Sequence, residues 1–219
     1  MKKRIALIHA VQVAMPPVEA AFRELWPDAE RVNLLDDSLS VDRGSSPDLS
    51  PAMFDRIARL GAYGHDLGAD GVLYTCSAFG PAIEAVAKAA RWPVLKPNEA
   101  MFEAALEKGR NIGLIASFER SLPSMEAEFR ELATARGVRA TITSICEPRA
   151  MPALQAGDAA THNRLLAAIA PKLAGCDAIM LAQFSTSVAA ADVQQAVPCP
   201  VLTSPGSAVL KLKRMLAEA

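Results

Sequence analysis

The sequence predicts an α/β fold with two pseudo-twofold-related, flavodoxin-like lobes, each built on a four-stranded parallel sheet. Three observations carry this prediction: an internal repeat, an alternation of strand-like with helix-like segments, and strand segments that are continuously apolar. Runs rich in Ile, Val and Leu are typical of parallel strands that helices cover on both faces. Alternating strands and helices indicate doubly wound sheets.

The repeat is a constant shift of 107 residues, by which Ile5 recurs as Ile112 and Asp70 as Asp177. The same shift relates residues 22–25 to 129–132, both Phe-Arg-Glu-Leu, and residues 93–95 to 200–202, both Pro-Val-Leu. One gapless shift that fits all these matches indicates duplication of a unit about half the chain long. Solenoid repeats are shorter, roughly 20–50 residues.

The expected elements alternate in the same order in both halves. Pro16 and Pro17 fit the first turn of a helix, and Ser50 fits an N-cap before Pro51. In the first half, strands are expected at 4–9, 30–35, 70–75 and 93–96, with helices at 16–26, 51–67 and 80–90. In the second half, strands are expected at 111–116, 138–145, 177–182 and 200–203, before a final helix at 206–218.

Two long polar or Pro- and Gly-rich segments, 36–48 and 146–158, interrupt this alternation after the second strand of each half. Such long connections are usually lids, binding loops or disordered segments. Arg43 and Arg149 lie in these segments and could pair with a second substrate carboxylate. His65 and His162 fall in predicted helices and are expected at the surface.

Composition narrows the class of protein. The chain has 219 residues, 51% of them hydrophobic, and a net charge of -1, so a nucleic-acid partner is not expected. The sequence has no run of eighteen or more uncharged apolar residues, so no membrane span is predicted. The N-terminal segment is interpreted as a strand, not a signal peptide. Four separated cysteines without a CxxC pair indicate reduced thiols in the cytoplasm and no metal site: Cys76, Cys146, Cys176 and Cys199.

Ligands of open parallel sheets bind beyond the carboxyl ends of the strands. Cys76 lies at such an end, just before a helix start at Gly80, and a helix N-terminus lowers a thiol pKa from about 8.5. The repeat places Gln183 at the position equivalent to Cys76, so in a pseudo-twofold arrangement the two face each other across one cleft. Hydroxyl-rich loops and helix-start amides predict an anion site there, with candidate hydroxyls on Thr75, Ser77, Ser117, Ser121, Ser185, Thr186 and Ser187.

Three short motifs at these strand ends resemble the aspartate/glutamate/hydantoin racemase superfamily, which includes arylmalonate decarboxylase and maleate isomerase. They are residues 74–78 (Tyr-Thr-Cys-Ser-Ala), 113–117 (Gly-Leu-Ile-Ala-Ser) and 181–185 (Leu-Ala-Gln-Phe-Ser). The resemblance covers the whole chain. It implies cofactor-independent chemistry on a small carboxylate, flanked by one cysteine from each half. It also implies that the final helix packs on the first half. The expected lobes are therefore 1–97 plus 205–219, carrying Cys76, and 98–204, carrying Gln183.

This sequence departs from the family pattern at two positions. Gln183 stands where the second cysteine is expected, and His9 stands where some members have an acidic residue after the first strand. A glutamine cannot exchange a proton at neutral pH, so three options stay open. Cys76 acts with another acid/base, His9 being the first candidate; Cys76 acts alone, as in decarboxylation; or its thiolate adds to an alkene or carbonyl.

The predicted catalytic residues are therefore Cys76 and His9, and the other three cysteines are expected to be bystanders. The predicted substrate contacts are Gln12, Ser77, Ser117, Phe118, Ser121, Gln183, Phe184 and Ser185. The leading function is an isomerase of the racemase type. The alternatives are a decarboxylase of a malonate-like acid and a non-catalytic carboxylate-binding protein. No cofactor is expected, and a homo-oligomer is possible.

Overall fold

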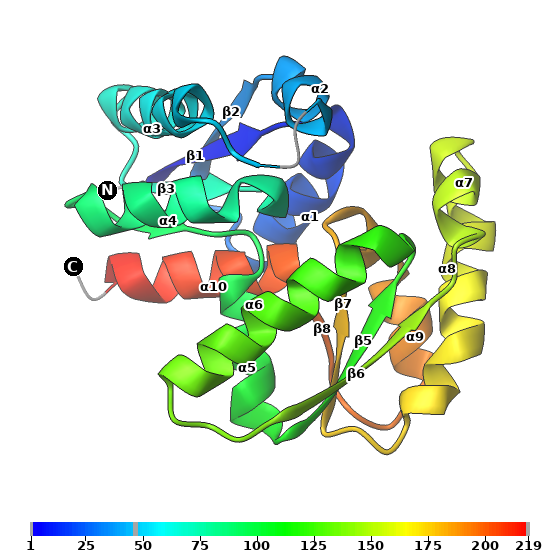
Figure 1. Cartoon of the computed structure of the whole chain (residues 1–219). Helices are drawn as coiled ribbons and strands as arrows, with labels where there is room; N and C mark the ends of the chain where they lie inside the picture. Colours follow the sequence, from blue (N-terminus) through cyan, green and yellow to red (C-terminus); the bar gives the residue numbers. More distant parts are fainter. Residues whose placement is uncertain (1, 46–47, 218–219) are drawn as a thin grey trace. The chain divides into compact units, whose positions relative to one another are not determined.

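The chain divides into two compact units in the computed structural model, which describes residues 2–45 and 48–217 (Figure 1). Unit 1 comprises Met1–Ala100 with Ala208–Ala219, and unit 2 comprises Met101–Ser207. Two helices run from one unit into the other, α5 (Glu99–Lys108) and α10 (Ser204–Ala217). Among the described residues, no helix has the length and apolar character needed to cross a membrane.

Unit 1 is built on a four-stranded parallel sheet in the order β2-β1-β3-β4. Its strands are β1 (Arg4–His9), β2 (Glu30–Leu35), β3 (Gly71–Tyr74) and β4 (Val94–Leu95). Its helices are α1 (Met15–Leu25), α2 (Ser38–Gly44), α3 (Pro51–Asp66) and α4 (Gly80–Ala89), with 3-10 turns η1 (Gln12–Ala14) and η2 (Ser77–Phe79). Ser50 caps α3 by accepting a hydrogen bond from the backbone N–H of Met53, as its sequence position predicts.

Unit 2 repeats this sheet in the equivalent order, β6-β5-β7-β8. Its strands are β5 (Asn111–Ala116), β6 (Thr141–Cys146), β7 (Ala178–Leu181) and β8 (Val201–Thr203). Its helices are α6 (Leu122–Ala135), α7 (Ala150–Gln155), α8 (Ala159–Ile169) and α9 (Ala190–Ala196), with 3-10 turns η3 (Glu119–Ser121), η4 (Ala170–Leu173) and η5 (Ser185–Ala189). The predicted fold class, two four-stranded parallel α/β sheets, is confirmed.

The 107-residue shift holds for three of the four strand pairs, since β1 begins at Arg4 and β5 at Asn111. It fails for the second strands, because β2 begins at Glu30 and β6 at Thr141, 111 residues later. Helix α6 is longer than α1, at 14 against 11 residues. It is followed by a turn at Gly137, whose φ of +66° suits glycine.

The repeated aromatic residues form the core of each unit. Phe22 and Phe129 are equivalent under the shift, and both are 0% exposed. Phe129 packs edge-to-face on Phe102, with ring centroids 5.7 Å apart. Burying one large side chain of this kind contributes about 2–3 kcal/mol.

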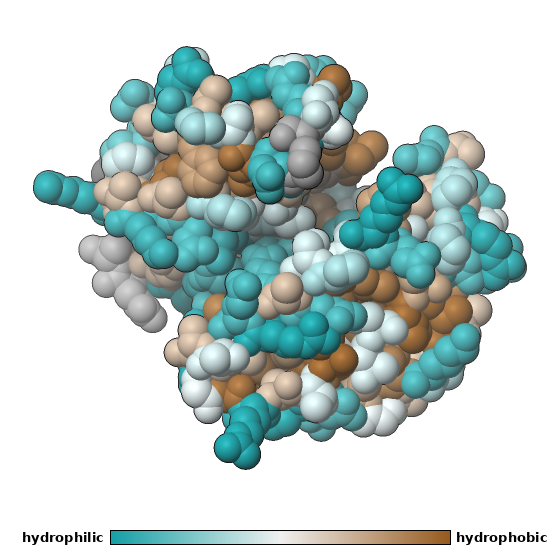
Figure 2. All heavy atoms as spheres, in the orientation of Figure 1, coloured by the Kyte–Doolittle hydropathy of each residue, from teal (hydrophilic) through white to brown (hydrophobic). Residues whose placement is uncertain are grey.

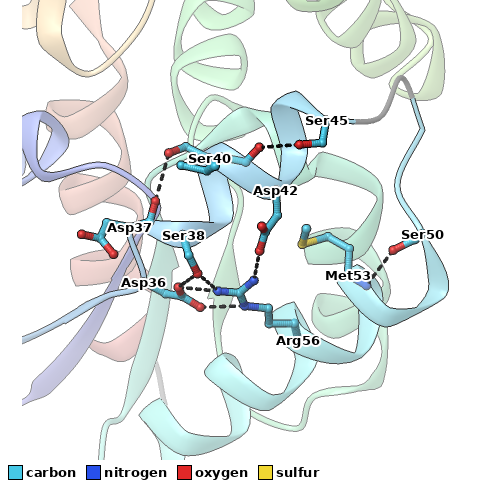
Figure 3. Close-up of polar contacts among 10 residues, drawn as sticks. Asp36, Asp37, Ser38, Ser40, Asp42, Ser45, Ser50, Met53 and Arg56 are labelled. Atoms are coloured by element: carbon cyan, nitrogen blue, oxygen red, sulfur yellow. Dashed lines mark hydrogen bonds and ion pairs between the residues drawn. The ribbon is translucent and has the colours of Figure 1, made fainter.

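The two interrupting segments are not open loops, because each contains a short helix, α2 or α7. In the first, Arg56 of α3 donates to both Asp36 carboxylate oxygens at 2.7 and 2.5 Å and pairs with Asp42 at 2.5 Å (Figure 3). In the second, Arg149 donates to both oxygens of Glu147 at 2.7 and 2.8 Å. Residues 46 and 47 of the first segment lie outside the described residues.

The expectation for the helical histidines is wrong at His162, which is 0% exposed. Its Nδ1 lies 2.9 Å from Asn163 Oδ1. His65 is half-buried and stacks on Trp92, with ring centroids 3.9 Å apart. The sequence pattern missed both because helices α3 and α8 use histidine on the side that packs against the unit.

Candidate functional site

The carboxyl ends of β1 and β3 lie side by side in unit 1, since Ile8 pairs with Tyr74 in register. The chain continues from β3 through Thr75, whose backbone N–H donates to the Ile8 carbonyl at 3.0 Å. Cys76 follows, directly before η2 and α4. The central strands of the sheet therefore fix the backbone that leads into the candidate thiol.

The Cys76 thiol is half-buried, and burial raises its pKa above the ordinary value. A hydrogen bond with the backbone of Ala78 and the positive charge of Arg43 act in the opposite direction, but their effect is smaller. The prediction that the helix start lowers this pKa is therefore wrong, because desolvation outweighs it. At neutral pH the group is a thiol, which can donate a proton.

Helix α2 is attached to the Cys76 loop by Arg43, whose Nε donates to the Ala78 carbonyl at 3.2 Å. Arg56 also contacts this segment. Figure 3 shows its contacts with Asp42 of α2 and with Asp36 just before the helix. Burial raises the pKa of Asp36, but hydrogen bonds from Arg56 and Ser38 bring it below its ordinary value. The segment that was predicted to be a lid or binding loop is thus tied to the candidate site by specific contacts.

His9, the last residue of β1, is 0% exposed and uses both ring nitrogens in hydrogen bonds. Its Nδ1 lies 2.9 Å from Thr75 Oγ1, and its Nε2 lies 2.9 Å from Asn33 Oδ1. Burial lowers its pKa, while the contacts with Asn33 and the charge of Glu19 act against this. His9 therefore lies behind Thr75 in the unit, and its direct contact with a substrate stays a prediction.

In unit 2, the equivalent strand end leads into Gln183, which has a backbone φ of +64°. Such a left-handed conformation costs a non-glycine residue about 1–2 kcal/mol, so the surrounding contacts hold it there. Its Nε2 donates to Ser121 Oγ, and Ser121 in turn donates to the Phe118 carbonyl at 2.7 Å. Its Oε1 is buried without a hydrogen-bond partner among the described residues.

Ser117, directly after β5, is 1% exposed, and its Oγ also lacks a partner within the described part of the chain. A buried hydroxyl without a partner is costly in water-free surroundings and invites an explanation such as a ligand or a water. Ser117 and Gln183 follow neighbouring strands, β5 and β7. They supply one free hydroxyl and one free carbonyl oxygen to the end of the unit 2 sheet.

The remaining predicted contacts differ in accessibility. Gln12 and Ser77 are exposed, and the Phe118 ring is 49% exposed. Phe184 and Ser185 are 4% and 9% exposed, so Phe184 packs in the unit. Among the predicted residues, hydrogen bonds join His9 with Thr75 and Gln183 with Ser121.

Several large hydrophobic side chains are exposed on segments that follow the strands. Val13 in η1 and Val41 in α2 are 63% and 69% exposed in unit 1, and in unit 2 Phe118 follows β5 and Val188 lies in η5. Figure 2 shows hydrophobic side chains interleaved with hydrophilic ones on the face in view.

The other cysteines have no comparable surroundings. Burial raises the pKa of Cys146, Cys176 and Cys199, and in each case a neighbouring negative charge raises it further. No cluster of three or more His, Cys, Asp or Glu side chains in the described ranges could hold a metal ion.

Sequence reasoning missed Asn33 and Glu19 and gave Arg43 a different role. Asn33 was detectable as a polar residue within the apolar part of its strand, residues 32–35, and its side chain joins His9 to Glu19. Glu19 and Arg43 lie on helices, where no sequence pattern separates a residue that supports a site from an ordinary surface charge.

Comparisons with known proteins agree with this architecture. The family model for Asp/Glu/hydantoin racemases matches residues 14–146. An aspartate racemase homologue from Pyrococcus horikoshii superposes with a TM-score of 0.74 at 14% identity, covering 99% of this chain and 100% of that one. Allantoin racemase from Klebsiella pneumoniae gives 0.73 at 19% identity, covering 99% and 89%. A cysteine-for-glycine variant of arylmalonate decarboxylase gives 0.67 at 19% identity, covering 98% and 93%. No curated protein matches the sequence.

Proposed function

The chain belongs to the Asp/Glu/hydantoin racemase family, and we propose that it is a cofactor-independent isomerase of this type acting on a small carboxylate. In this proposal Cys76 is the catalytic acid/base. The supporting observation is the position of its half-buried thiol after β3. The thiol is hydrogen-bonded with the Ala78 backbone, and the positive charge of Arg43 acts on its pKa. An acid/base group that exchanges protons with carbon needs this balance of burial and polar contacts.

The proposed reaction begins at a carbon next to the substrate carboxylate. Breaking its C–H bond leaves an electron pair that is delocalised into the carboxylate as an enediolate, and the proton passes to a base. A proton returned to the carbon then completes the exchange. Hydroxyl and amide donors at the strand ends would stabilise the developing negative charge.

The second acid/base of a two-thiol racemase is missing from this chain, because Gln183 occupies the position equivalent to Cys76. A glutamine amide neither accepts nor releases a proton at neutral pH. We propose instead that Gln183 and Ser117 are binding residues, since each has a buried polar atom without a partner among the described residues.

Two observations favour decarboxylation of a malonate-like acid as the second candidate function. The raised pKa of Cys76 keeps it protonated, and Gln183 removes a second thiol. In that reaction a carbon–carbon bond breaks, CO2 leaves, and the enediolate takes its proton from the Cys76 thiol. Water then reprotonates the thiolate, so one thiol is sufficient.

Incubation in D2O with amino acids, hydantoins and arylmalonates, each as separate enantiomers where they exist, distinguishes these functions. Deuterium at the α-carbon together with stereochemical inversion supports the isomerase, and CO2 release supports the decarboxylase. Saturable binding without either reaction means that the protein is a carboxylate-binding protein, and the enzymatic proposal is then wrong. Cys76→Ser is the matched control, because it replaces the titratable thiol with a hydroxyl of similar size.

A further inference from the structure

A chain of hydrogen bonds runs from the exposed edge of unit 1 to its interior, directly behind the residue that precedes Cys76. Glu19 Oε1 accepts from Asn33 Nδ2 at 2.8 Å, and Asn33 Oδ1 lies 2.9 Å from His9 Nε2. His9 Nδ1 lies 2.9 Å from Thr75 Oγ1, which also lies 3.2 Å from the Ile8 carbonyl. The chain therefore connects helix α1 through strands β2 and β1 to the end of β3.

The partners fix the direction of these hydrogen bonds. Because Asn33 donates its amide N–H to Glu19, its carbonyl faces His9 and must accept, so His9 Nε2 carries a proton. In neutral His9, Nδ1 then accepts from the Thr75 hydroxyl. In protonated His9, Nδ1–H donates to Thr75 Oγ1, and the hydroxyl proton turns to the Ile8 carbonyl. His9 can thus change by one proton without losing a hydrogen bond.

Unit 2 supplies an internal control for what this network contributes. Under the 107-residue shift, His9 corresponds to Ala116 and Thr75 to Ala182, and both alanines are 0% exposed. The same strand ends are therefore built in unit 2 without any polar pair. Formation of the sheet does not require His9 and Thr75, so their presence on the side of the thiol, opposite alanines on the side of Gln183, points to the chemistry.

We propose that His9 is a positioning residue for Cys76. It acts through Thr75 to fix the backbone that presents the thiol. The hydrogen bond between His9 and Thr75 exists in two arrangements that differ by one proton. This rests on the proposed function of Cys76. The charged groups around His9 come from α1, where Glu19 lies, and from β2, where Arg31 pairs with Glu19 at 3.3 Å. The segment after β3 contributes the Thr75 hydroxyl. Burial, which lowers the pKa of His9, favours the neutral arrangement at neutral pH.

The test measures alkylation of Cys76 by iodoacetamide, followed by mass spectrometry of each cysteine peptide, and needs no substrate. The variants are Thr75→Val, which keeps the shape but removes the hydroxyl, Thr75→Ser, which keeps the hydroxyl, and His9→Ala with Thr75→Ala, which copies unit 2. Cys146, Cys176 and Cys199 report general loosening within the same molecules.

Thr75→Val and the double variant are expected to slow Cys76 alkylation about tenfold, because the Ala78 backbone loses its fixed place at the thiol and the thiol pKa rises further. Thr75→Ser should behave as the parent, and the other three cysteines should not change. An unchanged or faster Cys76 in Thr75→Val would overturn the proposal, because His9 and Thr75 would then only fill space.

A second measurement decides the matter if the double variant does not fold. Nitrogen-15 NMR of the histidine rings in the parent should show His9 neutral and protonated at Nε2 near pH 7, whereas a proton at Nδ1 alone contradicts the network. The two proposals can also fail separately. A parent that alkylates as expected but converts no substrate removes the enzymatic proposal and leaves the positioning role of His9 intact.

Discussion

The two units share one framework but differ at both ends of their sheets. At the carboxyl end, unit 1 places a polar network behind Cys76, whereas unit 2 has alanines behind a strained Gln183. At the opposite end, Arg4 pairs in register with Glu30 and forms an ion pair at 2.9 Å. The equivalent register pair in unit 2 is uncharged, Asn111 with Thr141. The buried apolar residues of the central strands have been kept, while several residues at the strand ends have diverged.

One polar residue is kept in both units for a backbone reason. Asp70 accepts from the backbone N–H of Arg4 at 2.8 Å, and Asp177 accepts from that of Asn111 at 2.8 Å. Each aspartate thus satisfies the first amide of its central strand. The repeat retained this pair because it belongs to the framework, which explains why the match is visible in the sequence.

The largest expected difference between the strand ends concerns activity. Cys76→Ser should reduce exchange or decarboxylation about 100- to 10,000-fold, the usual contribution of a positioned acid/base. Cys146→Ser, at the end of β6, should leave turnover unchanged. Initial rates with the best substrate from the D2O survey test this. Equal losses in both variants would remove the distinction between the thiols.

The framework itself should respond equally in both units. Phe22→Ala and Phe129→Ala each remove a fully buried ring and should lower the free energy of unfolding by about 3–5 kcal/mol. Urea unfolding monitored by circular dichroism gives both values. A loss at only one position would show that the two equivalent rings do not contribute equally to the free energy of unfolding.

Gln183 tests whether the second strand end can be returned to the pattern of the first. Gln183→Ala should weaken substrate binding by about 1–3 kcal/mol, because a buried partner is left without a hydrogen bond. Gln183→Cys should restore the thiol pair that the family implies. It should therefore produce racemisation of a substrate that the parent only exchanges or decarboxylates. Deuterium incorporation into each enantiomer measures the gain. If the parent already racemises both enantiomers equally, another second base exists.

The smallest expected effect concerns Arg43. Its charge lowers the pKa of Cys76, so Arg43→Gln should raise that pKa further and move the rise of alkylation rate to higher pH. The group is a thiol below its pKa and reacts only as the thiolate, so the loss of rate is seen below the midpoint. The pH profile of iodoacetamide labelling measures the shift, with Arg149→Gln of unit 2 as the control. A shift of equal size in the control would contradict the proposed contact.

Sequence patterns predicted the framework well, because apolar runs and prolines in the first turn of a helix are local signals of strands and helices. Strands β1, β2 and β5 match their predicted ranges, whereas β6 begins at Thr141 rather than 138. Val138 and Ala140 fit a strand by composition but lie in the irregular segment between the turn at Gly137 and β6. The site was harder to predict, because the sign of the Cys76 pKa shift depends on burial, which a helix-start motif does not reveal. The positive φ of Gln183 was also not predictable, because a glutamine does not indicate this backbone conformation as a glycine does.

The crossing of α10 into unit 1 has a consequence for how the protein is made. Leu212 and Leu216 lie so close to Gly71 that a methyl group there would meet their side chains at 3.3 and 3.5 Å. Lys211 of the same helix pairs with Glu99 at 2.6 Å. Unit 1 therefore needs a segment that the ribosome synthesises only after all of unit 2. The unit that begins first is completed last, and during translation its sheet lacks the cover that α10 provides at Gly71.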